Sequence, residues 1–289
     1  MKAIIFGASG QDGFYLTKLL IKNLIRVIGV SRTGDYLRTD LSNFNDVSNL
    51  IKKEIPDYIF HLAANSTTKH EAIFENHETI STGTLNILEA VKQFAPLTKV
   101  FISGTGLQFF NDGFPIKETN SFAANNAYSI SRIQSVYAAR YYRDLGLKIY
   151  VGYFFNHDSP FRTERHVTKK ISETIKRISI DKWERLEIGD AFVVKEWSFA
   201  GDIVEGIWLL INQDNIFEAN ISSGEGHSIN EWIAECFKIV KIAPLNYVTK
   251  LEGFTSPYGR LVSDNSLIKS IGYKPMVSFK GLAQIMMNE

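Results

Sequence analysis

The chain has few of the residues that mark several classes of protein. It contains one cysteine in 289 residues, which excludes an internal disulfide and a cysteine-based metal cluster. Cys236 lies in a helical pattern of apolar residues, so we expect it in the core rather than at a reactive centre. The six histidines have no metal-ligand spacing, and we expect no bound metal.

The chain also lacks an excess of charge of either sign and has no long apolar run. Lys and Arg number 32 against 31 Asp and Glu, a net charge of +1. Such a surface has no field that steers a protein onto nucleic acid, so we expect no nucleic-acid partner. No apolar run reaches the ~18 residues of a membrane span, and the apolar start is too short for a signal peptide. We therefore expect a cytoplasmic protein with no membrane partner.

What the sequence does contain is a glycine turn between a strand and a helix. Residues 2–6 are apolar and predict a strand, and residues 14–23 are amphipathic and predict a helix. Gly7, Gly10 and Gly13 lie between them. In this context glycines let the backbone approach a pyrophosphate closely, while the helix N-terminus supplies unpaired N–H groups. The pattern predicts a dinucleotide site, and the alternative is a glycine turn without a ligand.

Beyond this turn, strand and helix patterns alternate along the chain. Such alternation predicts a doubly wound parallel α/β sheet, the Rossmann architecture. We expect a dinucleotide-binding domain over residues 1–156, to which residues 191–217 return, and a smaller C-terminal α/β substrate lobe over residues 157–289. An irregular stretch separates residues 104 and 127, and long loops of this kind are usually functional. Further strands are expected over 27–30, 58–62, 99–103 and 148–155, and helices over 45–54, 78–94 and 127–145.

Several longer motifs resemble one known family. The opening Gly-Ala-Ser-Gly-Gln-Asp-Gly-Phe-Tyr-Leu (7–16) and the segments 61–64, 155–160, 167–171 and 195–197 are similar to motifs of extended short-chain dehydrogenases/reductases that act on GDP-sugars. That group includes the GDP-mannose 4,6-dehydratases and the GDP-4-keto-6-deoxymannose reductases. The resemblance implies the Rossmann fold, a nicotinamide cofactor, a nucleotide-sugar substrate and a role in making sugars for surface polysaccharides.

The resemblance also aligns a catalytic pair. The family uses a tyrosine and a lysine four residues apart on one helix, and here those positions are Tyr128 and Arg132. Positions i and i+4 share a helix face, so the cation lies beside the phenol and favours the phenolate. Arginine keeps the charge but not the shape of the lysine, which in the family also contacts the nicotinamide ribose. An ordinary surface Tyr–Arg pair is the alternative.

A second departure from the family lies at the end of the strand before the long loop. The dehydratases carry Ser-Thr-Ser-Glu there, in which the threonine binds the sugar oxygen and the glutamate moves a proton. This chain has Thr105 and Leu107 at those two positions. A leucine cannot act as acid or base, so the elimination step lacks its proton carrier while hydride transfer does not. Thr105 is assigned to the C4 oxygen, with a strand-end turn as its alternative.

The cofactor is predicted from the end of the second strand. An acidic residue there would bind the ribose of NAD, but the chain has Ser31-Arg32-Thr33, and Arg32 fits the family position that meets the 2′-phosphate of NADP. NADP is therefore the expected cofactor, with NAD left open and a solvent-exposed Arg32 as the alternative. By resemblance, the cofactor contacts are Gly7, Gly10, Gln11, Asp12, Gly13, Arg32, Asp40, Leu41, Leu62, Ala63 and Ala64.

Four positions are expected to bind the substrate. Lys170 and Lys195 fall where the family has basic residues near the sugar diphosphate, and Asn156 falls where it has an asparagine beside the phosphates; Ser66 is assigned near the sugar. Charge-assisted contacts of this kind anchor a diphosphate, although either lysine alone is equally consistent with a surface charge. The family's Arg-Pro-x-Glu segment has become Ser256-Pro257-Tyr258-Gly259-Arg260, so the sugar and base specificity stay open.

Together these residues predict an NAD(P)-dependent oxidoreductase that transfers hydride at C4 of a nucleotide-linked hexose or heptose, GDP-linked, as a 4-keto reductase or C4 dehydrogenase. Two alternatives stay open: a nucleotide-sugar epimerase or 4,6-dehydratase, and a non-catalytic dinucleotide-binding regulatory protein. The resemblance implies a homodimer or homotetramer paired through the helices 78–94 and 127–145. The apolar residues expected to point outward there are Leu85, Leu88, Val136, Tyr137 and Tyr141, with packing of these residues on the sheet as the alternative.

Overall fold

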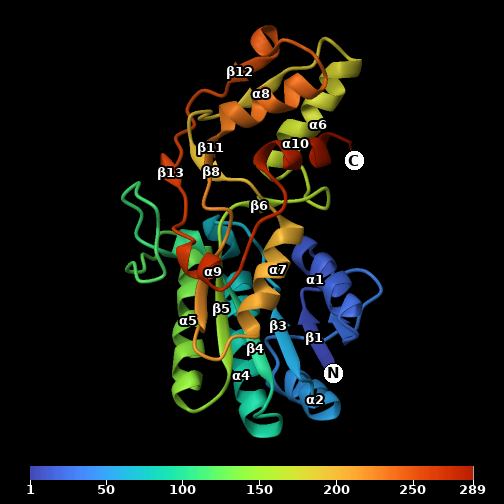
Figure 1. Ribbon diagram of the computed structural model, residues 1–289, viewed down its shortest axis with the longest axis vertical. Helices are drawn as coiled ribbons and strands as arrows, with labels where there is room; N and C mark the ends of the chain where they lie inside the picture. The colour runs from blue at the N-terminus through green and yellow to red at the C-terminus, as the bar shows by residue number, and fades with distance from the viewer. Residues whose placement is uncertain (289) are drawn as a thin grey trace.

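A six-stranded parallel sheet forms the core of the larger part of the computed structural model, which describes residues 1–288 (Figure 1). Its strand order is β10-β5-β4-β3-β1-β2, so the chain moves outward from β1 to β2 and then returns through β3. This reversal makes the sheet doubly wound and confirms the predicted fold class. The strands are β1 Lys2–Phe6, β2 Arg26–Val30, β3 Tyr58–His61, β4 Lys99–Thr105, β5 Ile149–Phe154 and β10 Glu218–Ile221.

Helices cover both faces of the sheet, because its central strands are apolar on both sides. One buried cluster joins α1 and α7 to the sheet, and a second joins α2, α4 and α5 to the opposite face. These helices are α1 Gln11–Lys22, α2 Phe44–Glu54, α4 Gly83–Phe94, α5 Ala127–Asp144 and α7 Ala200–Ile211.

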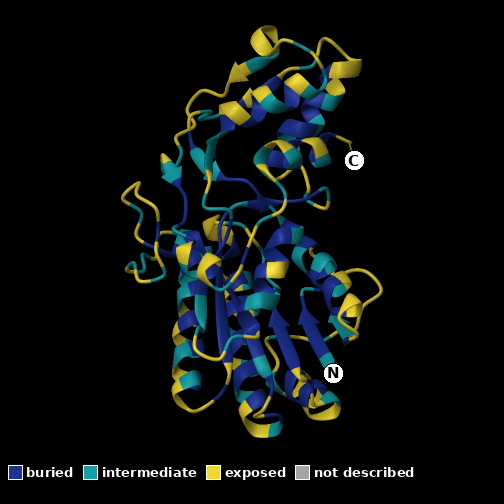
Figure 2. Cartoon of the chain, viewed as in Figure 1, coloured by how far each residue is buried: buried dark blue, intermediate teal, exposed yellow. Residues whose placement is uncertain are grey.

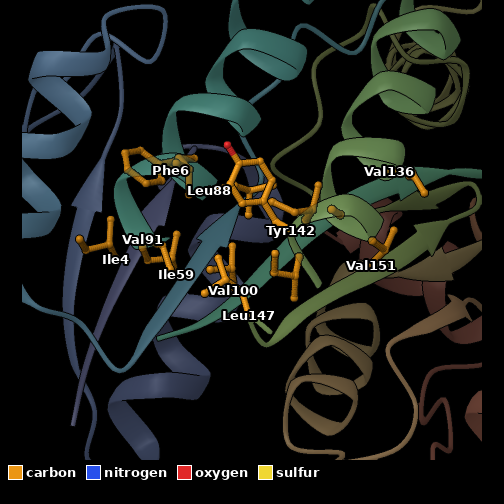
Figure 3. Close-up of a cluster of buried hydrophobic side chains, with 14 of the residues drawn as sticks. Ile4, Phe6, Ile59, Leu88, Val91, Val100, Val136, Tyr142, Leu147 and Val151 are labelled. Atoms are coloured by element: carbon orange, nitrogen blue, oxygen red, sulfur yellow. The ribbon is translucent and has the colours of Figure 1, made fainter. Parts of the chain in front are cut away.

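The second cluster corrects one expectation about the helix surfaces. Leu88 of α4 and Val136 of α5 have no exposed surface and lie among the strand side chains drawn in Figure 3. The prediction that they point outward is wrong, because their helical positions face the sheet. Leu85, Tyr137 and Tyr141 are 48%, 58% and 60% exposed, as expected.

The helix predicted over residues 78–94 is interrupted by a wider turn. α3 (Ile73–Asn76) leads into η2, a π-helix over His77–Thr82, and only then does α4 begin. Glu78 and Thr79 of this π-helix line the pocket described below. π-helical turns are often found at functional sites, and a short 3-10 turn, η1 His70–Ala72, precedes the segment.

A smaller lobe stands above the carboxyl ends of the strands (Figure 1). Three of its helices enclose a separate buried cluster that includes Trp197 and Trp232, whose rings stack at 4.9 Å. The helices are α6 Val167–Ile180, α8 Ile229–Ile239 and α10 Phe279–Asn288. Its paired strands are β8 Val194–Glu196 with β11 Gly226–Ser228 and β13 Arg260–Leu261, and β7 Leu186–Ile188 with β12 Val248–Lys250; η4 Pro244–Asn246 precedes β12.

Parts of the second half of the chain pack on the sheet rather than on the lobe. α7 packs against α1, and β10 pairs with β5, where Glu218 accepts hydrogen bonds from Arg140, Arg143 and the Tyr153 hydroxyl. β6 (His157–Asp158) and β9 (Ser198–Phe199) pair as a two-stranded parallel sheet. The short helix α9 covers Ser266–Ser270.

The long loop after β4 is irregular but anchored. It begins with η3 (Gly106–Gln108) and projects to one side of the sheet as an exposed segment (Figure 2). The Ile116 N–H donates to the Val262 carbonyl, and the Asn111 side chain donates to the Arg260 carbonyl. Through residues 1–288, no helix has the length and hydropathy to cross a membrane.

Candidate cofactor and active site

A pocket of about 780 Å³ opens at the carboxyl ends of β1, β2 and β3. In doubly wound sheets, ligands bind at this edge, where the strand order reverses. Among the predicted cofactor residues, the pocket brings together Gly7, Gly10, Arg32, Asp40, Leu41, Leu62, Ala63 and Ala64. The side chains of Gln11 and Asp12 and the backbone of Gly13 are not part of its wall.

The three glycines of the first turn differ in what lies close to them. Gly7 has φ +94°, and a Cβ on it would lie 2.7 Å from the Ala63 nitrogen; a Cβ on Gly13 would lie 2.4 Å from the Gly7 carbonyl oxygen. Both glycines are therefore required by the packing of the turn itself. A Cβ on Gly10 would meet only the Gly7 oxygen at 3.4 Å, an ordinary contact, so the space over Gly10 is left free for a ligand.

The start of α1 is suited to an anion. Gly10 is its N-cap and provides no side-chain hydrogen bond to the first turn. The N–H groups there consequently keep their capacity to donate, and they lie at the positive end of the helix dipole. These observations fit the pyrophosphate of a dinucleotide.

Gln11 and Asp12 point their side chains away from the pocket. The Gln11 Oε1 accepts from the Ser159 hydroxyl at 2.8 Å, and Asp12 Oδ1 lies 3.0 Å from His157 Nε2. Burial lowers the pKa of His157, but the Asp12 carboxylate outweighs it and leaves that pKa raised. The Gln-Asp pair thus joins α1 to β6 at the base of the lobe, and only its backbone N–H groups remain for a cofactor.

Two arginines lie at the end of β2. Arg32 Nη2 forms an ion pair with Glu75 Oε1 at 2.8 Å. Arg38 donates to the carbonyls of Ser31 and Gly34, both at 2.9 Å. Sequence reasoning missed Arg38. The feature that could have indicated it is the unusually short link between the second strand and Asp40, because a short link returns Arg38 to the end of that strand.

The tyrosine helix begins beside the end of β4. Asn126 caps α5 by accepting from the Tyr128 and Ser129 N–H groups at 3.1 and 2.9 Å, which fixes the first turn. Tyr128 is half-buried. The Arg132 guanidinium carbon lies 5.0 Å from the centroid of its ring, so the structure brings the predicted pair together through the ring face.

The guanidinium of Arg132 is directed into the protein. Only 3% of the residue is exposed, and Nη1 donates both to the Ser103 carbonyl and, at 2.7 Å, to the Ser103 hydroxyl. Burial, with the Arg132 charge as the second cause, lowers the pKa of His61 to about 3. A neutral imidazole therefore lies beside Arg132, and Ser103 is a partner that sequence reasoning missed.

Thr105 has a structural duty at the end of β4. Its hydroxyl oxygen accepts from the Leu107 N–H at 3.3 Å, and its own N–H donates to Gln108 Oε1 at 2.9 Å. The hydroxyl hydrogen is still available to a ligand. Leu107 packs against the cluster under α4 and α5, so its side chain makes an apolar contact at the end of this turn.

The predicted substrate residues do not all have free polar groups. The Lys170 ammonium is already engaged, because its Nζ donates to the Glu187 carbonyl at 2.8 Å. Ser66 lies exposed on the surface. Asn156 Oδ1 is buried without a hydrogen-bond partner in the described chain. Burial lowers the pKa of Lys195, with Asp158 opposing the shift, and Lys195 Nζ lies 5.7 Å from the centroid of the Tyr258 ring. Asn156 and Lys195 are thus the better placed to receive a ligand.

Residues 1–288 contain no group of three or more His, Cys, Asp or Glu side chains that could hold a metal ion. The strand-edge pocket, the uncapped glycine turn and the tyrosine helix at the end of β4 are instead the arrangement of a nucleotide-binding enzyme with a Rossmann sheet.

Comparison with known proteins identifies the family. The model described as GDP-mannose 4,6 dehydratase matches residues 4–286, and the chain therefore belongs to that family of nucleotide-sugar enzymes. A relative, GDP-mannose 4,6 dehydratase 2 of Arabidopsis thaliana, is 29% identical over 99% of this chain and 86% of its own length.

Solved structures share the fold at lower identity. UDP-glucose 4-epimerase of Thermus thermophilus, in complex with NAD, has a TM-score of 0.85 at 20% identity, covering 100% of this chain and 98% of its own. The RMD protein of Pseudomonas aeruginosa, complexed with NADPH, has a TM-score of 0.86 at 20% identity, covering 99% and 96%. Both cofactor types therefore occur within this architecture.

Proposed function

We propose that the chain is an NAD(P)-dependent oxidoreductase that acts at C4 of a nucleotide-linked sugar, as a 4-keto reductase or C4 dehydrogenase. The observation that carries this proposal is Leu107, which is half-buried against the core cluster and which the resemblance aligns with the glutamate of a dehydratase. Without a carboxylate there, the loss of water has no group at position 107 to carry its proton. Hydride transfer at C4 does not need a carboxylate at this position.

The pocket at the strand ends would hold the cofactor. The N–H groups at the start of α1 bind the pyrophosphate, Gly10 lets it approach, and Asp40, Leu41 and Ala63 line the adenosine end. When bound, a nicotinamide cofactor supplies or accepts the hydride. The Rossmann relatives with NAD and NADPH support this assignment without choosing between the two.

Tyr128 exchanges the proton of the C4 oxygen, and Thr105 donates its hydroxyl hydrogen to the same oxygen. Arg132 is a positioning residue: its guanidinium supports the Tyr128 ring and is itself fixed on Ser103. Asn156 and Lys195 bind the diphosphate of the substrate, with Lys170 and Ser66 as outer contacts. The family match supports GDP as the nucleotide.

A second candidate is a 4,6-dehydratase or epimerase, which the family model and the Arabidopsis relative favour. Such an enzyme would need an acid or base at a position other than 107. The products distinguish the candidates, because only a dehydratase forms a 6-deoxy-4-keto sugar from GDP-mannose.

The test incubates the protein with GDP-mannose and NADP or NAD, and separately with GDP-4-keto-6-deoxymannose and NADPH or NADH. We expect no 6-deoxy-4-keto product by NMR in the first reaction and oxidation of the reduced cofactor in the second, abolished in Tyr128→Phe. A 6-deoxy-4-keto product at a catalytic rate would overturn the proposal in favour of the dehydratase.

The substrate class is tested independently of turnover. Small molecules released from denatured purified protein are identified by mass spectrometry. A retained NADP or NAD together with a GDP-sugar supports the assignment. Retained cofactor with no turnover of any nucleotide sugar would favour the non-catalytic alternative.

A further inference from the structure

The two arginines at the end of β2 differ in how their charge is compensated. The carboxylate of Glu75 accepts from Arg32 at 2.8 Å and, through its other oxygen, from Asn65 at 2.6 Å. The hydrogen bond from Arg32 is the main cause of the lowered pKa of Glu75. Arg32 thus already has an anionic partner, and an incoming phosphate must compete with Glu75 for it.

Within residues 1–288, Arg38 forms no ion pair with a carboxylate. Its Nη1 and Nη2 donate to the Ser31 and Gly34 carbonyls, which are neutral acceptors. Neither carbonyl neutralises the positive charge, and the two hydrogen bonds hold the guanidinium over the turn that follows β2. Arg38 lines the same pocket as Arg32, so its charge lies close to a ligand bound at the end of the pocket next to β2.

Three hydroxyl groups gather beside the two cations. Ser9 Oγ lies 2.5 Å from Ser31 Oγ and 3.0 Å from Thr33 Oγ1, and all three residues line the pocket. Hydroxyl donors with a guanidinium suit a phosphate monoester. The unmodified ribose of NAD is ordinarily bound by a carboxylate at the end of the second strand, where this chain has Ser31-Arg32-Thr33 instead.

We propose that Arg38, rather than Arg32, distinguishes NADP from NAD by binding the 2′-phosphate together with Ser9, Ser31 and Thr33, and that Glu75 restrains Arg32. This rests on the proposed function, since it requires a dinucleotide in the pocket. The position of the discriminating cation then follows from the short link after β2, which returns Arg38 to the strand end.

The test measures direct binding of NADPH and NADH by fluorescence titration to the wild-type protein and to Arg38→Met, Arg32→Met and Glu75→Gln. Arg38→Met is expected to weaken NADPH binding by at least ~10-fold, the scale of a lost charge-assisted pair, and to leave NADH binding within about twofold. Arg32→Met should have a smaller effect on NADPH. Glu75→Gln should tighten NADPH binding, because it releases Arg32.

The pattern across variants separates this inference from the alternatives. Equal weakening of NADPH and NADH by Arg38→Met would show that Arg38 only shapes the turn, and would overturn the inference. A larger effect of Arg32→Met on NADPH would also overturn it. Failure of the wild-type protein to bind either cofactor would instead overturn the proposed function. Arg32→Met retains the Arg38 contacts, so it keeps the test decisive where Arg38→Met unfolds: loss of the preference for NADPH in Arg32→Met overturns the inference.

Discussion

At the scale of the residue, Arg132 makes two contacts, of which the flat one against the Tyr128 ring is specific to a guanidinium. Its planar guanidinium lies against the Tyr128 ring and donates twice to Ser103 from one nitrogen. An ammonium group is a compact charge without the flat surface that stacks on a ring. The contact with the ring therefore favours a specific role for the planar guanidinium over simple occupation of the lysine position.

Tyr128→Phe is expected to lower turnover by at least ~10²-fold, the usual scale for loss of a general acid or base. Cofactor binding should be unchanged, because Tyr128 does not line the pocket at the strand ends. Turnover assays and cofactor titration on the same preparation check both statements. Near-normal turnover would remove Tyr128 from the mechanism.

Arg132→Lys is expected to lower kcat by about tenfold or more with little change in the KM for the nucleotide sugar, because the lost contacts orient Tyr128 rather than the substrate. It should also cost about 1–3 kcal/mol of unfolding free energy, since the buried Ser103 acceptors lose partners. Steady-state kinetics and urea unfolding measure the two effects, with the exposed Arg165→Lys as the matched control. Full activity in Arg132→Lys would contradict the orienting role.

Single-residue chemistry was only partly predictable from the sequence. The spacing of Tyr128 and Arg132 predicts a common helix face, but not the rotamer that takes the guanidinium to Ser103. The glycine turn was predictable because its backbone constraint is local. Arg38 was not, because its approach to the pocket depends on how a loop folds back.

At the scale of the element, the N-terminus of α1 is joined to β6 by Asp12 and His157. Burial raises the pKa of Asp12, yet His157 and Arg162 outweigh it and leave that pKa lowered; the pKa of His157 is raised by Asp12 against the effect of burial. The pair contributes its full stability above the unfolded Asp value of 3.8 and below the unfolded His value of 6.5. That contribution is lost as the pH rises through the raised pKa of His157.

Asp12→Asn should therefore destabilise the protein by about 1 kcal/mol or more near pH 6, one pKa unit corresponding to ~1.36 kcal/mol. At pH 9 the difference from the wild type should shrink, because His157 is neutral in both proteins. Urea unfolding at the two pH values measures this. A difference that stays constant with pH would show that the pair is not ionised.

The boundaries of the helices were likewise only partly predictable from the sequence. The helix of residues 127–145 was predictable from its period and is observed as Ala127–Asp144. The π-helical turn within residues 78–94 was not, because α and π turns share the same apolar pattern over one turn. It lies beside the buried His61, which is near the backbone of Ile80 and Thr79, and the sequence period carries no information on such a tertiary contact.

At the scale of the whole molecule, α4 and α5 carry exposed apolar residues on the side away from the sheet. Leu85, Tyr137 and Tyr141 are the exposed members, and we propose that they pair with a second copy around a two-fold axis.

Light scattering at micromolar concentration should give at least twice the 32.7 kDa monomer mass. Tyr141→Glu should shift the protein toward the monomer, because a charge would be buried at the interface. Trp183→Glu is the matched control, since Trp183 is 86% exposed on the lobe. A wild-type monomer would reject the dimer, and a dimer unaffected by Tyr141→Glu would reject this surface.

The return of β10 to the sheet also has a consequence during synthesis. β5 is completed at Phe154, but the strand that pairs with it is made only when residues 218–221 appear. Until then the nascent sheet has an open edge at β5, and Arg140, Arg143 and the Tyr153 hydroxyl lack the Glu218 carboxylate that joins them. Open sheet edges invite pairing with other chains, so we expect the nascent protein to be exposed to such pairing while residues 155–217 are translated.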